Sequence, residues 1–230
     1  MRCDLFFEQK ASIWSALTVG DGRDKMVIKE VLMKREFFPA GNMLYPIPAV
    51  MVSCAGEGIK PNIITIAWAG TICSNPPMVS ISIRKERYSY DIIKNSGEFV
   101  INLVIEELTR AADFCGVRSG RELDKFKEMK LTPAMGKLSI APLIMEAPVN
   151  IECRVKEIIP LGSHDMFLGE VVSVAVDQRY LDEKGKFHLN QTGLIVYSHG
   201  EYYGLGKYIG KFGYSVQKPK PAKSKKDMQR

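Results

Sequence analysis

The chain has few of the residues that metal centres and hydrolytic sites require. Its five cysteines are scattered, and none stands in a Cys-x-x-Cys or Cys/His spacing, which excludes the usual zinc and iron–sulfur motifs. Three histidines, no Ser-His-Asp order and no paired carboxylates leave no catalytic constellation and no metal site to propose. We therefore expect most of the cysteines to be buried apolar residues. Cys115 stands in a more polar setting that would leave it exposed, so a reactive role stays open there.

Long hydrophobic runs are also absent. No apolar run approaches the roughly 18 residues that a membrane span needs. Asp4, Glu8 and Lys10 interrupt any apolar core at the N-terminus, so the start is not a secretory signal. With 46% hydrophobic and 25% charged residues, the composition is typical of a soluble globular protein. The sequence predicts a cytoplasmic protein without a membrane partner.

The positive charge is concentrated at one end of the chain. The net charge is +6, and most of the surplus comes from Lys218, Lys220, Lys223, Lys225, Lys226 and Arg230, set against Asp227. Because this tail has little apolar content, we expect residues 216–230 to be disordered. A solvated tail is favoured over a nucleic-acid arm, since the remaining chain is close to neutral.

The first residues differ in pattern from the rest. Residues 1–32 show no sustained hydrophobic period, and Gly20-Asp-Gly22 would break a helix. This extension is a start-site artefact, a mobile arm or a short helix. The predicted domain covers residues 33–215.

Within that domain the pattern is mostly β. Short helices are predicted at 90–95, 106–114 and 121–129, and no βαβ succession is present. The pattern predicts a mainly β fold, one antiparallel β-barrel with a few peripheral helices. The β-branched and alternating segments that predict its strands are 49–54, 62–69, 78–83, 98–103, 149–159, 166–176 and 194–197.

The segment from Asn62 to Ser89 is the most informative. Two β-branched runs are joined by Ser74-Asn-Pro-Pro77, and in the second run Ser80 and Ser82 alternate with apolar residues. That run delivers Arg84, Lys85, Arg87 and Ser89 to the expected start of a helix, where free backbone N–H groups favour an anion such as phosphate. A phosphate site beside a strand with Thr65 and Trp68 suggests a phosphorylated aromatic cofactor.

The ordered motifs resemble one known family, over residues 36 to 214. They are Tyr45-Pro-Ile-Pro48, Lys60-Pro-Asn-Ile-Ile-Thr65 with Ala67-Trp68, Ser74-Asn-Pro-Pro77, Arg87-Tyr-Ser89, Gly97-Glu-Phe-Val-Ile-Asn102, Cys115-Gly-Val-Arg-Ser-Gly120 with Asp124-Lys-Phe126, His164-Asp-Met-Phe-Leu-Gly-Glu-Val171 and Tyr203-Gly-Leu-Gly206. The chain resembles the flavin reductase-like domain family, the FMN-binding split barrels that include the flavoredoxins.

The resemblance implies a split β-barrel of antiparallel, Greek-key type that forms a homodimer and holds FMN non-covalently near the dimer interface. It implies an NAD(P)H-dependent flavin oxidoreductase, with NAD(P)H as electron donor. The alternative is a flavoredoxin-like electron carrier reduced by a partner redox protein. In both, the flavin carries the chemistry.

The same resemblance, together with the polar face, suggests a set of cofactor-binding residues: Asn62, Thr65, Ala67, Trp68, Ser80, Ser82, Arg84, Arg87, Ser89, Asn102 and His164. Arg87 would bind the phosphate, or be a solvated turn residue. Ser89 would cap the helix or help to bind phosphate, and Thr65 would hydrogen-bond a ring carbonyl or N5. If these residues do not contact the cofactor, Trp68 is a core residue, Asn102 is a turn residue and His164 is a surface residue. We expect His188 and His199 to face solvent.

The aromatic segment Tyr202–Phe212 is a candidate for the dimer interface or for a cover over the cofactor. Packing against its own barrel is the alternative.

Overall fold

The computed structural model describes residues 35–216. Its main compact unit begins at Leu44, and residues 35–43 contain neither helix nor strand. The expectations for residues 1–32 and for the basic tail lie outside the described residues, apart from Val216. No helix in the described part of the chain is long and apolar enough to cross a membrane.

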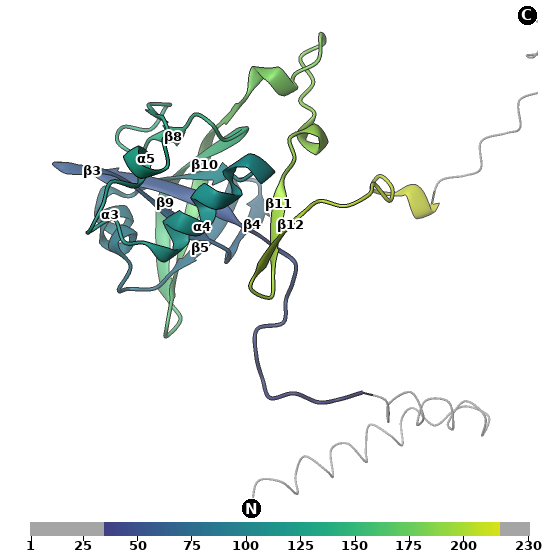
Figure 1. Ribbon diagram of the computed structural model, residues 1–230, viewed down its shortest axis with the longest axis horizontal. Coiled ribbons are helices and arrows are strands. Elements are labelled where there is room, and N and C mark those ends of the chain that lie inside the picture. The colour runs from purple at the N-terminus through teal and green to yellow at the C-terminus, as the bar shows by residue number, and fades with distance from the viewer. Residues whose placement is uncertain (1–34, 217–230) are drawn as a thin grey trace, which may run out of the picture. The chain divides into compact units, whose positions relative to one another are not determined.

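The main sheet is antiparallel throughout and runs in the order β3-β2-β6-β9-β10-β5-β4. Figure 1 labels β3, β4, β5, β9 and β10 among its strands. The strands β6, β9 and β10 follow one another as neighbours, and β5, which precedes them in the chain, lies beside β10. This is the Greek-key arrangement. The strands are β2 Val50–Gly56, β3 Ile59–Ile66, β4 Ala69–Ser74, β5 Pro77–Ile83, β6 Glu98–Leu103, β9 Val149–Pro160 and β10 Asp165–Val176.

The sheet closes on itself at one short bend. Strands β3 and β4 lie at its opposite edges, yet only Ala67 and Trp68 separate them along the chain. The two edges must therefore meet, and the backbone N–H of Ser82 on β5 donates to the Trp68 carbonyl at 2.9 Å. The predicted antiparallel barrel is confirmed. The predicted strand 62–69 was wrong at its end, because the chain bends after Ile66 to make this corner.

Alternation along β5 explains how one strand serves both the core and a polar surface. Val79, Ile81 and Ile83 are buried, whereas Ser80 and Ser82 are half-buried on the opposite face. The buried residues join a barrel core that includes Val52, Phe99 and Phe167. Burial of such side chains is the main stabilising contribution to the fold.

Helix α3 (Tyr88–Ser96) begins after an extended Arg87 and ends at Gly97, whose φ of 71° suits glycine. Its buried residues Ile92 and Ile93 pack against the barrel core. The predicted helix is confirmed. The proposed cap at Ser89 was wrong, because Arg87 holds the N-cap position and Ser89 lies inside the first turn.

A second helical layer covers β3. It comprises the 3-10 turn η1 (Glu106–Leu108), α4 (Thr109–Val117) and α5 (Lys125–Glu128). Residues Ala111, Ala112 and Cys115 of α4 pack with Ile63 of β3 in a further apolar cluster. Cys115 is fully buried, and burial raises the pKa of its thiol to about 11. The expectation that Cys115 is exposed was wrong, and its thiol stays protonated at neutral pH. Cys54 and Cys153 are buried as expected, and Cys73 is half-buried.

Smaller elements complete the described chain. A three-stranded sheet runs in the order β1-β11-β12, and its last strand was missed because its sequence reads as part of a glycine- and tyrosine-rich end. The 3-10 turns η2 (Gln178–Tyr180), η3 (Leu189–Gln191) and η4 (Tyr214–Val216) lie nearer the C-terminus. The short strands are β1 Ile47–Pro48, β7 Pro133–Ala134, β8 Leu143–Ile144, β11 Ile195–Ser198 and β12 Glu201–Gly204.

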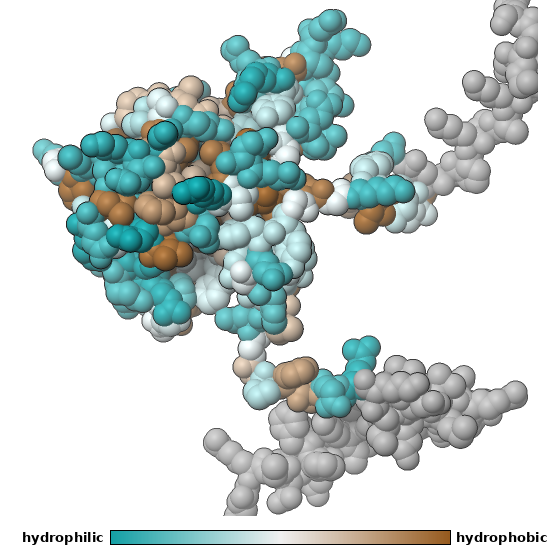
Figure 2. All heavy atoms as spheres, viewed as in Figure 1, coloured by the Kyte–Doolittle hydropathy of each residue, from teal (hydrophilic) through white to brown (hydrophobic). Residues whose placement is uncertain are grey.

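The segment after β12 keeps its apolar side chains at the surface. Tyr202 packs on Tyr197 with ring centroids 5.5 Å apart, and its hydroxyl donates to Asp113 at 3.3 Å. Beyond it, the large side chains of Leu205, Tyr208, Ile209, Phe212, Tyr214 and Val216 are exposed, and Figure 2 shows hydrophobic residues scattered over the mostly hydrophilic face of the described chain. Packing against the same barrel therefore accounts for Tyr202 and not for the rest of the segment.

Candidate functional site

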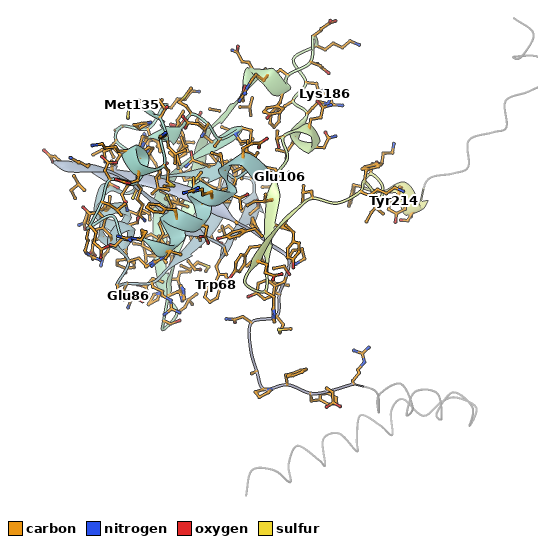
Figure 3. The ribbon with its side chains drawn as sticks, in the orientation of Figure 1. Trp68, Glu86, Glu106, Met135, Lys186 and Tyr214 are labelled. Atoms are coloured by element: carbon orange, nitrogen blue, oxygen red, sulfur yellow. The ribbon has the colours of Figure 1, made fainter. Side chains whose placement is uncertain are left out.

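Two adjoining cavities lie where the β3–β4 bend meets the loop between β5 and α3. The larger has a volume of about 590 Å³, and Figure 3 shows Trp68 and Glu86, from these two segments, on the same side of the barrel. Its size lies within the range of small-molecule sites. It is lined by Ile64, Thr65, Ile66, Ala67, Trp68, Ser82, Ile83, Arg84, Glu86, Arg87, His164 and Tyr197.

Trp68 and His164 place two neighbouring aromatic rings in the larger cavity. Their ring centroids are 4.4 Å apart with the planes tilted by 42°, and Trp68 is 42% exposed. Ser163 Oγ lies within hydrogen-bond distance of His164 Nδ1, at 2.9 Å. Burial, and next the Arg84 guanidinium, lower the pKa of His164 below its ordinary value, so the ring is neutral near pH 7. This surface suits a planar aromatic ligand.

The second cavity is smaller and strongly basic, and we call it the cationic cavity. Its volume is about 230 Å³, and it shares Ile64, Glu86 and Arg87 with the larger cavity. Among its described lining residues, four cations face one carboxylate, that of Glu86. The N-terminus of α3 opens at Tyr88 and Ser89, which adds backbone N–H groups and a positive dipole end. It is lined by Asn62, Ile64, Glu86, Arg87, Tyr88, Ser89, Arg118, Ser119, Gly120, Arg121 and Lys125.

Lys125 is the most unusual residue of the cationic cavity. It is only 3% exposed, and its Nζ donates to the carbonyls of Ile63 and Cys115, each at 2.7 Å. Burial lowers its pKa from 10.5 to about 8. No described carboxylate pairs with it, and a buried ammonium without an anionic partner is costly. A bound anion would supply that partner.

Hydrogen bonds hold the other predicted residues in place. An Nη2 hydrogen of Arg87 is donated to the Gly116 carbonyl, which leaves most of the five guanidinium N–H donors for a ligand. Asn62 Nδ2 donates to Ser89 Oγ at 2.8 Å. Thr65 Oγ1 donates to the Ala112 carbonyl of α4. In this arrangement Thr65 can only accept from a ligand, so the expected bond to a ring carbonyl is not available to it.

Nine of the eleven predicted residues line these two cavities: Asn62, Thr65, Ala67, Trp68, Ser82, Arg84, Arg87, Ser89 and His164. Ser80 lies on the same face of β5 as Ser82, where it pairs with Leu168 and Gly70 in the sheet, and it is outside both linings. Of the other histidines, His188 is half-buried and pairs with Asp182 at 2.9 Å, while His199 is exposed, as expected.

Asn102 does not belong to the site, and its prediction is corrected here. It is fully buried, and its Nδ2 donates to Met51 O and Ser53 Oγ, each at 2.9 Å. Its Oδ1 accepts from the Ile144 backbone N–H at 3.0 Å and from Asn150 Nδ2 at 2.8 Å. It satisfies buried polar groups in the core instead of turning the chain or meeting a cofactor.

Several lining residues were missed from the sequence: Glu86, Arg118, Arg121, Lys125 and Tyr197. The motifs Cys115-Gly-Val-Arg-Ser-Gly120 and Asp124-Lys-Phe126, which hold Arg118 and Lys125, belong to the family resemblance, but neither residue was predicted to bind a ligand. A lysine buried by folding carries no local signal, because short helices on a surface often contain lysine.

Within residues 35–216, no group of three or more His, Cys, Asp or Glu side chains could hold a metal ion. An aromatic surface beside a pocket of cations has the chemistry that a planar ring joined to a phosphate, as in FMN, requires of a site. The fold and the site thus define a β-barrel with an aromatic cavity beside a cationic one.

The comparison with known proteins agrees with that class. Residues 42–206 match the model of the flavin reductase-like domain, so the chain belongs to the flavin reductase-like domain family, the split barrels. A protein of Archaeoglobus fulgidus is 30% identical over 169 residues, which are 74% of this chain and 93% of that protein.

Two solved structures are also similar. The flavoredoxin of Desulfovibrio vulgaris (Miyazaki F) is 32% identical with a TM-score of 0.74, over 80% of this chain and 100% of that one. The flavoredoxin of Methanosarcina acetivorans is 27% identical with a TM-score of 0.71, again over 80% of this chain and 100% of that one. These likenesses support a flavin-related oxidoreductase or electron-transfer protein.

Proposed function

We propose that the protein binds FMN non-covalently and acts as an NAD(P)H-dependent flavin oxidoreductase. The observation that carries the proposal is that the aromatic surface of Trp68 and His164 adjoins a pocket that contains Arg87 and the unpaired cation of Lys125. Bound FMN would supply the hydride and electron transfer. The protein would supply position and electrostatics.

Each part of the site has a distinct role in this proposal. Arg87 and Lys125 bind the phosphate, helped by the N–H groups at the start of α3. Trp68 and His164 pack against the ring. Because His164 is neutral near pH 7, it orients the ring without adding a positive charge beside it. Ser89, held by Asn62, fixes the first turn of α3 next to the phosphate.

The alternative is a flavoredoxin-like electron carrier that is reduced by a partner redox protein. It is favoured by the similarity to two flavoredoxins. The same residues would hold FMN in both cases, so the direct test is kinetic. In an anaerobic stopped-flow record, we expect NADH or NADPH to bleach the absorbance of the protein-bound flavin within the turnover time of the enzyme. Reduction only after a redox protein is added would reject the enzyme and support the carrier.

The assembly proposed is a homodimer in which the second chain covers apolar surface near the C-terminus. The support is the exposure of Ile209 and Phe212 among the residues that follow β12. Two-fold symmetry is the commonest way in which oligomers bury such surface. Light scattering at micromolar concentration should give twice the mass of the chain. A monomer that retains tight FMN binding would show that the site needs no second chain.

A further inference from the structure

One buried carboxylate next to the site is incompletely hydrogen-bonded. Asp165 is the first residue of β10 and is 4% exposed. Its Oδ2 accepts a hydrogen bond from the Tyr90 hydroxyl at 2.6 Å, but among the described residues its Oδ1 accepts none. Lys85 Nζ lies 3.4 Å from that Oδ1 and forms an ion pair with it. A buried carboxylate in this state lowers stability, so its presence requires an explanation other than packing.

The two partners of Asp165 lie on either side of Arg87 along the chain. Lys85 precedes Arg87 in the loop between β5 and α3, and Tyr90 follows it in the first turn of α3. The backbone N–H of Arg87 donates to the Arg84 carbonyl at 3.1 Å, and that of Tyr90 donates to the Arg87 carbonyl at 2.9 Å. These turns are consecutive, so one carboxylate holds both ends of the segment that carries Arg87.

The start of β10 connects this segment to the larger cavity. Asp165 pairs in the sheet with Ile83, the last residue of β5. Asp165 and Phe167 are both buried, at alternate positions of β10, and the Phe167 ring packs on the Tyr90 ring with centroids 5.3 Å apart. His164, the residue before Asp165, lines the larger cavity. Asp165 therefore lies between the segment that carries Arg87 and one of the two rings of the larger cavity.

The side chain of Tyr90 does not itself belong to the site. It is 6% exposed, and Tyr90 lines neither the larger nor the cationic cavity. The hydrogen bond to Asp165 raises the pKa of the Tyr90 hydroxyl to about 12, so the hydroxyl remains a donor at neutral pH. Removing it would affect a bound phosphate only through the position of the loop.

We propose that Asp165 is a positioning residue of the flavin site. Through Lys85 and Tyr90 it fixes the loop that carries Arg87. Because His164 directly precedes Asp165, the loop is also fixed relative to the aromatic end of the site. Groups that are held in place before binding need less ordering when the ligand arrives, which increases affinity. The inference rests on the proposed FMN site and adds a residue that contacts neither the ring nor the phosphate.

The test compares dissociation constants for FMN and riboflavin in Tyr90→Phe, Lys85→Met and Asp165→Asn, because only FMN has a phosphate for the loop to bind. Tyr90→Phe removes the hydroxyl and keeps the ring. Its control is Ile93→Val, which makes a small change in the buried face of the same helix. The control for Lys85→Met is Lys94→Met, because Lys94 is also exposed and lies over the Tyr90 ring, 5.9 Å from its centroid.

We expect Tyr90→Phe and Lys85→Met each to weaken FMN binding about three- to tenfold, the effect of one ordinary hydrogen bond, with riboflavin unchanged within about twofold. The controls should leave the ratio of the two dissociation constants unchanged. Direct contact of Lys85 with the phosphate would also weaken FMN alone, and a double variant separates the two cases. Adding Lys85→Met to Asp165→Asn should weaken FMN by less than about twofold more, whereas the full loss would overturn the positioning role.

Thermal unfolding without ligand separates positioning from fold stability. If FMN and riboflavin weaken together, or if neither changes while the unfolding temperature falls, Asp165 only stabilises the fold and the positioning role is wrong, while the FMN site stands. Should Asp165→Asn fail to fold, Tyr90→Phe decides, because a change in FMN affinity alone supports the role and any other result rejects it. If the wild-type protein does not bind FMN, the proposed function fails, and this inference fails with it.

Discussion

Replacing Arg87 with alanine tests whether the cationic cavity binds the FMN phosphate. Arg87 lines both the larger and the cationic cavities, and most of its guanidinium donors are left for a ligand. Hydrogen bonds to charged groups contribute about 1.5–3 kcal/mol. Losing that contribution should raise the dissociation constant for FMN by about 10- to 150-fold. Riboflavin has the same ring and no phosphate, so its affinity should change little.

The assay is a titration followed by flavin fluorescence, with both ligands measured against both proteins. Arg84→Ala is the matched control, because Arg84 lines only the larger cavity and pairs with the exposed Glu86 at 3.7 Å; we expect less than about a threefold change, as for surface ion pairs. Arg87 also holds the Gly116 carbonyl, so thermal unfolding without ligand should be recorded for each variant. Equal weakening of FMN and riboflavin would refute the phosphate assignment.

Three further outcomes are expected. FMN affinity should fall as the pH rises through about 8, because Lys125 loses its proton there. Riboflavin affinity should not depend on pH in this range, and Lys125→Met should abolish the pH dependence of FMN binding. A pH-independent FMN affinity in the wild type would count against a role for Lys125. Flavin binding should quench tryptophan fluorescence in the wild type, and Trp68→Phe should remove most of that quenching; unchanged quenching would place the ring elsewhere. Gly169→Ala should lower the free energy of unfolding in urea by about 1–3 kcal/mol, because its Cβ would lie 2.6 Å from the buried Phe99 ring; an unchanged midpoint would show that the core adapts.

The sequence predicts those strands and helices in which buried residues recur at a regular spacing. In β5, alternate residues enter the core, so a period of two marks both the strand and its polar face. The helix predicted at 90–95 lies within α3, which the structure bounds with an extended Arg87 and a left-handed Gly97. The nine predicted site residues that line the two cavities lie on such elements or on the turns between them.

What the sequence could not predict depends on contacts between distant segments. Asn102 looked like a residue at a strand end, but its partner Asn150 is 48 positions away and becomes a neighbour only when β6 pairs with β9. Cys115 was expected to be exposed because its neighbours in sequence are polar, and nothing in the sequence around Lys125 marks it as buried. Their burial arises when α4 and α5 pack on β3.

The bend at Ala67 and Trp68 gives the site a mechanical role. It joins the two edges of the sheet, and both residues line the larger cavity. A ligand bound there would contact the segment where the barrel closes and would stabilise the closure. A ligand stabilises the state that binds it in proportion to the logarithm of its free concentration over its dissociation constant. Without the ligand, local opening would start at this corner. Cofactor dissociation would therefore be coupled to local opening of the barrel between β3 and β4.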